Sequence, residues 1–326
     1  MKEPSFWYSK RGIRATCLAP LGWVYAKLTA ARLSRSTPHH LEIPVVCVGN
    51  INAGGTGKTP TVIALAQRLR DLGHVPHVVS RGHGGTLAGP VNVDPAKHRA
   101  DQVGDEPLLI SAFCEVWVSK DRATGGQAAQ EGGATIILLD DGFQNPSLHQ
   151  DLKLVVVDAA RGFGNGYCIP AGPLREPVGA GLARADALIT IGDTDAQDSF
   201  SAPTPAKPHR FSAALVPLQT GMDWTTGTYI AFAGIGQPDK FFDTLKDLGA
   251  TLVRTEALAD HEPLSAAFMS RLERDALAQG AQVVTTEKDA ARLPRHWRGK
   301  VLSLPVRLEF QDEDALRVLL KRFPAP

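Results

Sequence analysis

The amino-acid sequence predicts an α/β protein with a doubly wound parallel sheet, a second, smaller α/β domain and an N-terminal amphipathic helix. Three observations support this fold class: short continuous apolar runs alternate with helical patterns, a Pro/Ser/Ala-rich stretch at 199–208 interrupts the alternation, and strands and helices resume after it. Continuous apolar runs are typical of strands buried on both faces of a parallel sheet. With 326 residues the chain is long enough for two cores. We expect a first domain at 37–208 and a smaller domain, with linker strands and a C-terminal helix that returns to the first, at 209–326.

The composition excludes several classes of protein. The net charge is +1 and 21% of residues are charged, so bulk electrostatics does not favour nucleic-acid binding. The four cysteines are scattered without metal-binding spacing, which is typical of reduced thiols in a cytosolic protein. No run approaches the ~20 apolar residues that a transmembrane helix needs, and we expect neither a membrane span nor a signal peptide.

The segment 1–36 is basic and aromatic, with seven Lys/Arg and one acid. Leu18, Leu21, Tyr25 and Leu28 recur at helical spacing. A cationic, aromatic helix of this kind is typical of an anionic membrane surface. It is equally typical of a helix that packs on its own domain and leaves a basic face in solvent. The residues alone leave both interpretations open.

The predicted elements follow in order after this segment. An apolar strand at 44–48 precedes a helix that ends at Gly73, where glycine is a common helix stop. Further short buried strands are predicted at 75–79, 116–119, 135–139, 152–157 and 187–191. The second half contains a strand at 229–233, a helix that ends at Gly249 and a strand at 281–286; a strand at 301–310 and a helix at 312–323 are expected to return to the first domain.

The loop between the first strand and the first long helix has the glycine-rich composition of a phosphate-binding loop. Several glycines allow backbone N–H groups to converge on phosphate oxygens, and the helix N-terminus adds its dipole. Lys58 is expected to reach the β- and γ-phosphates and the Thr59 hydroxyl to ligate Mg²⁺. The usual pattern has a glycine where this chain has Asn52. The loop predicts a P-loop NTPase-type fold that binds a nucleotide through Asn52, Ala53, Gly54, Gly55, Thr56, Gly57, Lys58 and Thr59.

Three positions carry acids or a histidine that are candidates for metal binding or proton transfer. Asp140 and Asp141 end the most apolar strand, where they fit a metal site better than the alternative of an Asp-Gly turn. Asp105 begins a helix, together with Glu106; it is either a base for a hydroxyl proton or an N-terminal helix cap. His261 follows an aspartate in a loop of the second half, and its spacing alone indicates only a solvated residue.

Two further stretches resemble motifs without matching them. The stretch 234–240 ("GIGQPDK") follows a strand like a dinucleotide-binding turn, but Pro238 and Lys240 break that pattern. The stretch 286–290 ("TEKDA") is similar to a guanine-reading motif, but Lys288 and Asp289 are adjacent and the spacing is wrong. The sequence assigns neither stretch a role.

Seven segments together resemble the tetraacyldisaccharide 4'-kinase family, the lipid A 4'-kinases of Gram-negative bacteria. In order along nearly the whole chain they are "GNINAGGTGKTP", "SRGHGG", "VGDEPLL", "LDDGFQNPSLHQDLKLVVVDAARGFGNG", "PAGPLREP", "ADHEP" and "TTEKDAARL". The resemblance implies a P-loop domain and a smaller α/β domain joined by a two-stranded linker. It also implies a kinase that uses ATP and Mg²⁺ to phosphorylate the 4'-hydroxyl of a tetraacylated glucosamine disaccharide 1-phosphate.

The resemblance also implies roles for single residues. Residues 52–59 hold ATP, and Asp105 is the catalytic aspartate with His261 as its partner. Asp140, Asp141, Gln144 and Glu176 fall on acidic and amide positions near the metal and phosphates, and Arg81 and Arg175 fall on basic ones. Because such a substrate is anchored by acyl chains, the resemblance favours the membrane interpretation of the N-terminal helix.

The implied location is the cytoplasmic face of the bacterial inner membrane, with peripheral attachment, an acylated disaccharide lipid as substrate, no nucleic acid and no obligate protein partner. The alternative is a soluble P-loop regulatory ATPase that acts on a protein partner.

Overall fold

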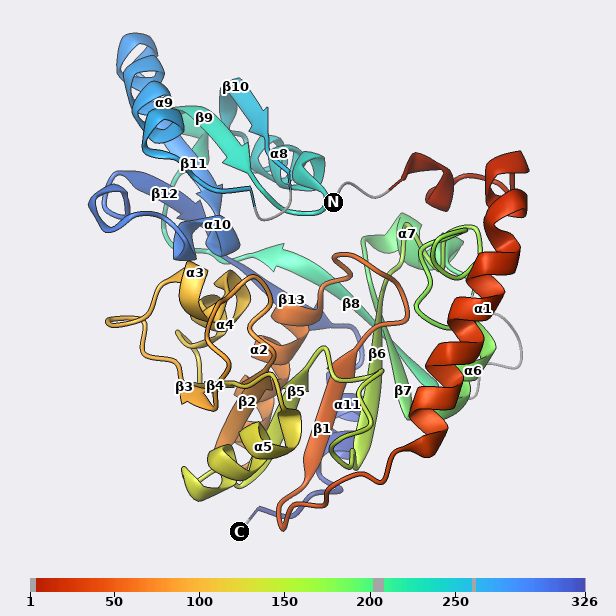
Figure 1. Cartoon of the computed structure of the whole chain (residues 1–326). Coiled ribbons are helices and arrows are strands. Elements are labelled where there is room, and N and C mark those ends of the chain that lie inside the picture. The colour runs from red at the N-terminus through yellow and green to blue at the C-terminus, as the bar shows by residue number, and fades with distance from the viewer. Residues whose placement is uncertain (1–3, 202–207, 260–261, 326) are drawn as a thin grey trace.

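The structure, a computed structural model, describes residues 4–201, 208–259 and 262–325. Within these ranges the chain builds a nine-stranded and a four-stranded sheet (Figure 1). We call the larger sheet with its helices the first domain and the smaller sheet with its helices the second domain. The seven inner strands of the larger sheet run parallel, and a short antiparallel strand closes each edge. Its spatial order is β13 (Val306–Phe310), β8 (His209–Pro217), β7 (Ala187–Ile191), β6 (Leu152–Asp158), β1 (Val45–Gly49), β5 (Ile136–Asp140), β2 (Pro76–Ser80), β4 (Glu115–Val118) and β3 (Val91–Asn92).

Helices cover both faces of this sheet, as a doubly wound fold requires. One face packs on α2 (Lys58–Asp71), α4 (Asp105–Ile110) and α11 (Glu313–Leu320), with Leu65, Leu108 and Leu316 among the buried contacts. The other face packs on α1 (Ile13–Arg35), α5 (Arg122–Glu131) and α6 (Val178–Arg184). The predicted fold class is therefore confirmed.

The second domain repeats the layered arrangement at a smaller scale. Its parallel strands lie in the order β10 (Thr251–Ala257), β9 (Thr228–Ala233), β11 (Gln282–Thr286) and β12 (Val301–Leu304). Helix α8 (Pro238–Asp247) covers one face and α9 (Ala266–Gln279) the other, and the short α10 (Glu287–Ala291) follows β11 directly.

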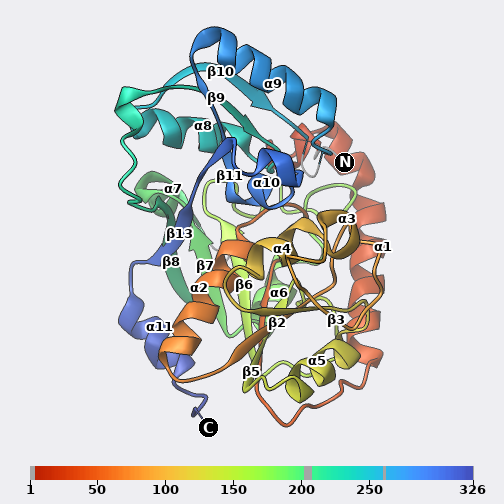
Figure 2. The ribbon, with the colours of Figure 1, turned by 90° about the vertical axis from the view of Figure 1, so that its left-hand side faces the viewer.

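The predicted strand at 301–310 is wrong as a single element, because it divides at Pro305. Residues before the proline form β12 of the smaller sheet, and residues after it form β13, which pairs with β8 at the edge of the larger sheet. Proline has no N–H to donate to a ladder, so it suits the point where the chain leaves one sheet. Helix α11 packs against the larger sheet, and β8 and β13 run side by side between the domains (Figure 2).

Helix α1 lies along one side of the first domain (Figure 1). Its side chains have an unusual distribution. Its buried residues are small: Ala15, Gly22 and Thr29, seven residues apart. A methyl group on Gly22 would lie 2.7 Å from the backbone oxygen of Cys168, so the helix approaches the domain closely there. The large apolar side chains point into solvent; they include Leu21, Trp23, Val24, Tyr25 and Leu28. In the described part of the chain, no helix is long and apolar enough to cross a membrane.

Candidate active site

The phosphate loop and the Asp140–Asp141 pair lie at the carboxyl edge of the larger sheet, where ligands of open α/β sheets bind. Strand β1 ends at Gly49 and leads into the phosphate loop, and its neighbour β5 ends at Asp140. The next strand, β2, ends at Ser80, and β6 on the other side of β1 ends at Asp158. Strand order therefore brings the loop and the aspartate pair together.

The phosphate loop needs glycine at two positions. Gly54 has φ 103° and Gly57 has φ 91°, in the region where side chains are strained. A methyl group on Gly57 would also lie 2.5 Å from the Ile191 side chain. Helix α2 begins at the next residue, Lys58, so its free N–H groups face the loop. This is the geometry of an anion site.

Asn52, the departure from the usual loop pattern, has a structural explanation. Among the described residues, Asp141 is the one non-glycine residue with positive φ, so the backbone at Asn52 does not require glycine. The Asn52 side chain is buried and its amide donates to the oxygen of Gly162 at 3.0 Å. The next N–H, of Ala53, donates to the oxygen of Pro173 at 2.7 Å. These bonds brace the first half of the loop against the segment after β6.

A second asparagine supports the loop from inside and was not predicted. Asn50 is fully buried, and its amide donates to the Thr56 hydroxyl at 3.1 Å and to the oxygen of Gly54 at 3.3 Å. Its backbone oxygen accepts a hydrogen bond from Gln144 at 2.8 Å. The only sequence signal was a polar residue directly after a buried strand.

Asp140 fits a cation ligand. The carboxyl is buried, its Oδ2 accepts from the Ser80 hydroxyl at 3.0 Å, and its Oδ1 has no hydrogen-bond partner among the described residues. Burial and the charge of Glu106 raise the pKa of Asp140 to about 7. A buried oxygen without a donor indicates a position for a bound cation or proton. No three His, Cys, Asp or Glu side chains form a metal cluster within the described ranges. Mg²⁺ takes one or two carboxylates and completes its shell with phosphates and water, so a buried carboxylate oxygen such as Asp140 Oδ1 suits it.

Asp141 lies in a different environment, although it is the next residue. Its φ of 54° turns the chain sharply. Buried Arg122 holds this turn by donating to the backbone oxygens of Asp140 at 3.2 Å and Asp141 at 2.8 Å. Burial opposes ionisation of the Asp141 side chain, but Lys58 at 3.8 Å and Arg175 at 2.9 Å keep its pKa below the usual value. Arg122, distant in sequence, was missed by the sequence analysis.

Gln144 and Glu176 lie beside the loop and contact each other at 2.9 Å. The Glu176 carboxylate is buried, and Arg184 of α6 donates to both of its oxygens at 2.7 Å. Gln144 in turn bonds Asn50, so this group connects α6 to the phosphate loop. Glu176 therefore has an arginine as its charge partner here.

Asp105 is the first residue of α4 and is buried. Its Oδ1 accepts the N–H of Glu106 at 3.0 Å, and Glu106 lies near enough to raise the pKa of Asp140. The start of α4 thus faces the end of β5. From the second domain, Lys288 of α10 reaches Glu106 at 3.4 Å. The resemblance implies His261 as the partner of Asp105. His261 lies outside the described residues, so the Asp105–His261 pair stays a prediction.

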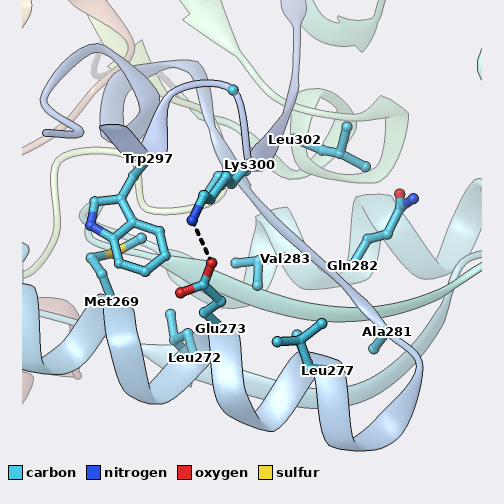
Figure 3. Close-up of a pocket in the computed structure, with 13 residues that line it drawn as sticks. Met269, Leu272, Glu273, Leu277, Ala281, Gln282, Val283, Trp297, Lys300 and Leu302 are labelled. Atoms are coloured by element: carbon cyan, nitrogen blue, oxygen red, sulfur yellow. Dashed lines mark hydrogen bonds and ion pairs between the residues drawn. The ribbon is translucent and has the colours of Figure 1, made fainter. Parts of the chain in front are cut away.

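A cavity of about 310 Å³ in the second domain is lined by none of these residues, and Figure 3 shows the side chains that line it. It is lined mainly by apolar side chains of α9 and the β11–β12 region, including Leu272 and Trp297. Its charged side chains, Glu273 and Lys300, bond each other at 2.7 Å. It offers no acid or base free for chemistry, and we do not assign the reaction to it.

Comparisons with known proteins identify the family. A family model described as tetraacyldisaccharide-1-P 4'-kinase matches residues 14–324. A tetraacyldisaccharide 4'-kinase of Dinoroseobacter shibae is 60% identical over 98% of this chain and 97% of its own length. One from a Jannaschia species is 55% identical over 96% of each chain. The crystal structure of an LpxK from Aquifex aeolicus in complex with ATP aligns with a TM-score of 0.78 and 28% identity, over 95% of this chain and 99% of the other. The chain belongs to the tetraacyldisaccharide 4'-kinase family.

Proposed function

We propose that the chain transfers the γ-phosphate of ATP to the 4'-hydroxyl of a tetraacylated disaccharide 1-phosphate, with Asp105 as the residue that accepts the hydroxyl proton. The kinase activity itself follows from the family: the chain is an ATP-dependent 4'-kinase of lipid A biosynthesis. The observation that carries the residue assignment is the meeting of three groups at one sheet edge. These are the phosphate loop, the partnerless Asp140 oxygen and the acidic start of α4.

The phosphate loop and Lys58 bind and polarise the transferred group. Loop N–H groups and the α2 N-terminus supply fixed positive poles, and Lys58 supplies a full charge. Lys58 is nearly buried, and its Nζ lies 3.8 Å from Asp141 Oδ1, which holds the ammonium group beside the loop. Phosphoryl transfer needs positioning and charge stabilisation more than covalent chemistry.

The residues that hold Mg²⁺ are proposed to be Thr59 and Asp140, with Asp141 beside them and Gln144 and Glu176 outside the direct ligands. Asp140 has the free buried oxygen. Glu176 is already paired with Arg184, and Asp141 with Arg175. When bound, Mg²⁺ neutralises charge on the phosphates and orients them.

Attachment to the inner face of the inner membrane is proposed from α1. A surface helix of a soluble protein normally turns its large apolar side chains toward its own core. Here they face outward from a helix that packs through small residues, and Arg14, Lys27, Arg32 and Arg35 lie on the same helix. Apolar and cationic side chains together favour an anionic bilayer surface. An acylated substrate in that bilayer is then within reach of the site.

The test is transfer of label from γ-labelled ATP to the acylated disaccharide. Asp105→Asn should lower kcat by about 10²–10⁴, the contribution of a positioned base, with ATP affinity preserved because Asp105 is not in the loop. Asp101→Asn is the matched control: it lies four residues away, is exposed and pairs with Arg99. An unchanged kcat in Asp105→Asn would contradict the assignment.

The soluble regulatory ATPase is not favoured by any match reported above. It would hydrolyse ATP at a rate that does not respond to the acylated disaccharide, and the same assay measures that.

A further inference from the structure

The two stretches left without a role, 234–240 and 286–290, lie next to each other in the second domain. Asp289 is fully buried, and its Oδ2 accepts the N–H of Gly234 at 2.9 Å and the Thr286 hydroxyl at 2.8 Å. The turn after β9 and helix α10 therefore form one surface. Figure 2 shows α10 directly against α4 of the first domain.

That surface contacts the first domain on two sides of the phosphate loop. On one side, Lys240 Nζ at 2.9 Å and Gln237 Nε2 at 2.6 Å donate to Oδ2 of Asp158, at the end of β6. On the other side, Lys288 Nζ lies 3.4 Å from Glu106 Oε1 on α4. In both pairs the second domain supplies the cation and the first domain the carboxylate.

Between the two contacts, the turn lies over the phosphate loop. A methyl group on Gly236 would lie 3.9 Å from the backbone nitrogen of Gly55. Glycine on both sides leaves the two backbones free to approach a phosphate chain from opposite directions. The turn is thus in position to cover phosphates bound by the loop.

Each carboxylate is also connected to a site residue. The other oxygen of Asp158 accepts the N–H groups of Ala160 and Arg161, and the turn they form carries Gly162, whose oxygen holds the Asn52 amide. Glu106 is hydrogen-bonded through its N–H to Asp105. A change in the docking of the second domain is therefore transmitted to the loop and to α4.

We propose that Lys240 and Lys288 are positioning residues that dock the second domain onto the first, so that the Gly234–Gln237 turn closes over the phosphates of bound ATP. This inference rests on the proposed function and adds the residues that hold the cleft closed. Because only the docked arrangement places the turn over the loop, kcat follows the docked fraction of molecules. Lys240 acts through Asp158 and Lys288 through Glu106.

The experiment compares Lys240→Met, Lys288→Met and the double variant of the full chain with two matched controls. Lys246→Met removes a lysine of the same helix α8 that pairs with exposed Asp243 at 2.9 Å, and Lys300→Met removes one that pairs with Glu273 inside the second domain. We expect kcat to fall about twofold to fivefold in each single variant and further in the double variant, a range consistent with one charged contact. Lys240→Arg should recover most of the loss, and the controls should match the wild type.

A double-mutant cycle separates docking from general damage. Asp158→Asn keeps an acceptor for the N–H groups of Ala160 and Arg161 but loses the charge that Lys240 contacts. If the two act as one pair, Asp158→Asn combined with Lys240→Met should have nearly the kcat of the worse single variant. Strictly multiplicative losses, or single variants as active as the wild type, would overturn the proposal.

Amide hydrogen exchange gives a readout that does not depend on activity. With an ATP analogue present, Lys240→Met and Lys288→Met should exchange faster than wild type in 234–240 and 52–57, while Lys246→Met should not. Equal exchange in all variants would overturn the docking role. A wild-type protein that does not label the acylated disaccharide would contradict the proposed function but not the docking proposal. The exchange comparison tests the docking proposal independently of activity.

Discussion

Replacing three exposed apolar side chains of α1 should release the protein from anionic vesicles without unfolding it. Leu21, Trp23 and Leu28 are 58%, 63% and 66% exposed. They therefore contribute little to the packing of the helix, which uses Ala15, Gly22 and Thr29. The change is the triple variant Leu21→Ser, Trp23→Ser, Leu28→Ser.

The magnitude follows from the surface that a bilayer would cover. Fully burying one such side chain is worth about 1.5–3 kcal/mol, and with about 60% of each available, each contributes roughly 1–2 kcal/mol. The triple variant should then lose roughly 3–5 kcal/mol of binding free energy, or about two to four orders of magnitude in the partition constant. The basic residues remain, at about 1 kcal/mol each near an anionic surface, so some salt-sensitive binding should persist.

The assay is co-sedimentation with vesicles that contain anionic lipid, together with thermal unfolding. The control replaces two equally exposed side chains elsewhere, Leu277→Ser and Val318→Ser, which are 77% and 72% exposed. Both proteins should unfold at the wild-type temperature, and only the α1 variant should lose binding. Equal binding of the wild type and the α1 variant, or equal loss in the control, would refute the reasoning.

Three further predictions concern the site and the helix contact. Lys58→Ala should remain folded and lose most kinase activity in the label-transfer assay, because its charge acts on phosphate; wild-type turnover would contradict the loop assignment. Because burial raises the pKa of Asp140 from 3.8 to about 7, this group stabilises the metal-free protein below pH 4 and loses that contribution as pH rises through 7. Thermal unfolding at pH 6 and pH 8 should show Mg²⁺ raising Tm more at pH 8, and this difference should vanish in Asp140→Asn. Gly22→Ala should lower the free energy of unfolding by about 1–3 kcal/mol, as expected for an overpacked contact, and should therefore lower Tm. Gly179→Ala should leave Tm unchanged, because a methyl group there meets nothing within 4 Å.

The sequence by itself determined the features that depend on neighbouring residues. Strands β1 and β5 are continuous apolar runs, and burial on both faces of a parallel sheet requires that pattern. The phosphate loop lies between β1 and α2, and Asp140 lies at the end of β5, so local order already placed them at strand ends. The resemblance to a known family added roles that no spacing could supply, such as that of His261 as the partner of Asp105.

Only the tertiary structure decided what depends on contacts between distant segments. In the folded protein Arg122 donates a hydrogen bond to the backbone of Asp141, and Arg184 forms an ion pair with Glu176. The spacing of these residues in the sequence predicts neither contact. The tertiary structure also showed which side of α1 is buried: the pattern of large residues suggested one face, but the close approach at Gly22 selects small side chains instead. The short stretches 234–240 and 286–290 gained a meaning only when folding brought them beside the phosphate loop and α4. Hydrophobic period fixes which elements form, whereas the partner of a polar side chain is set by the packing of elements far apart in the chain.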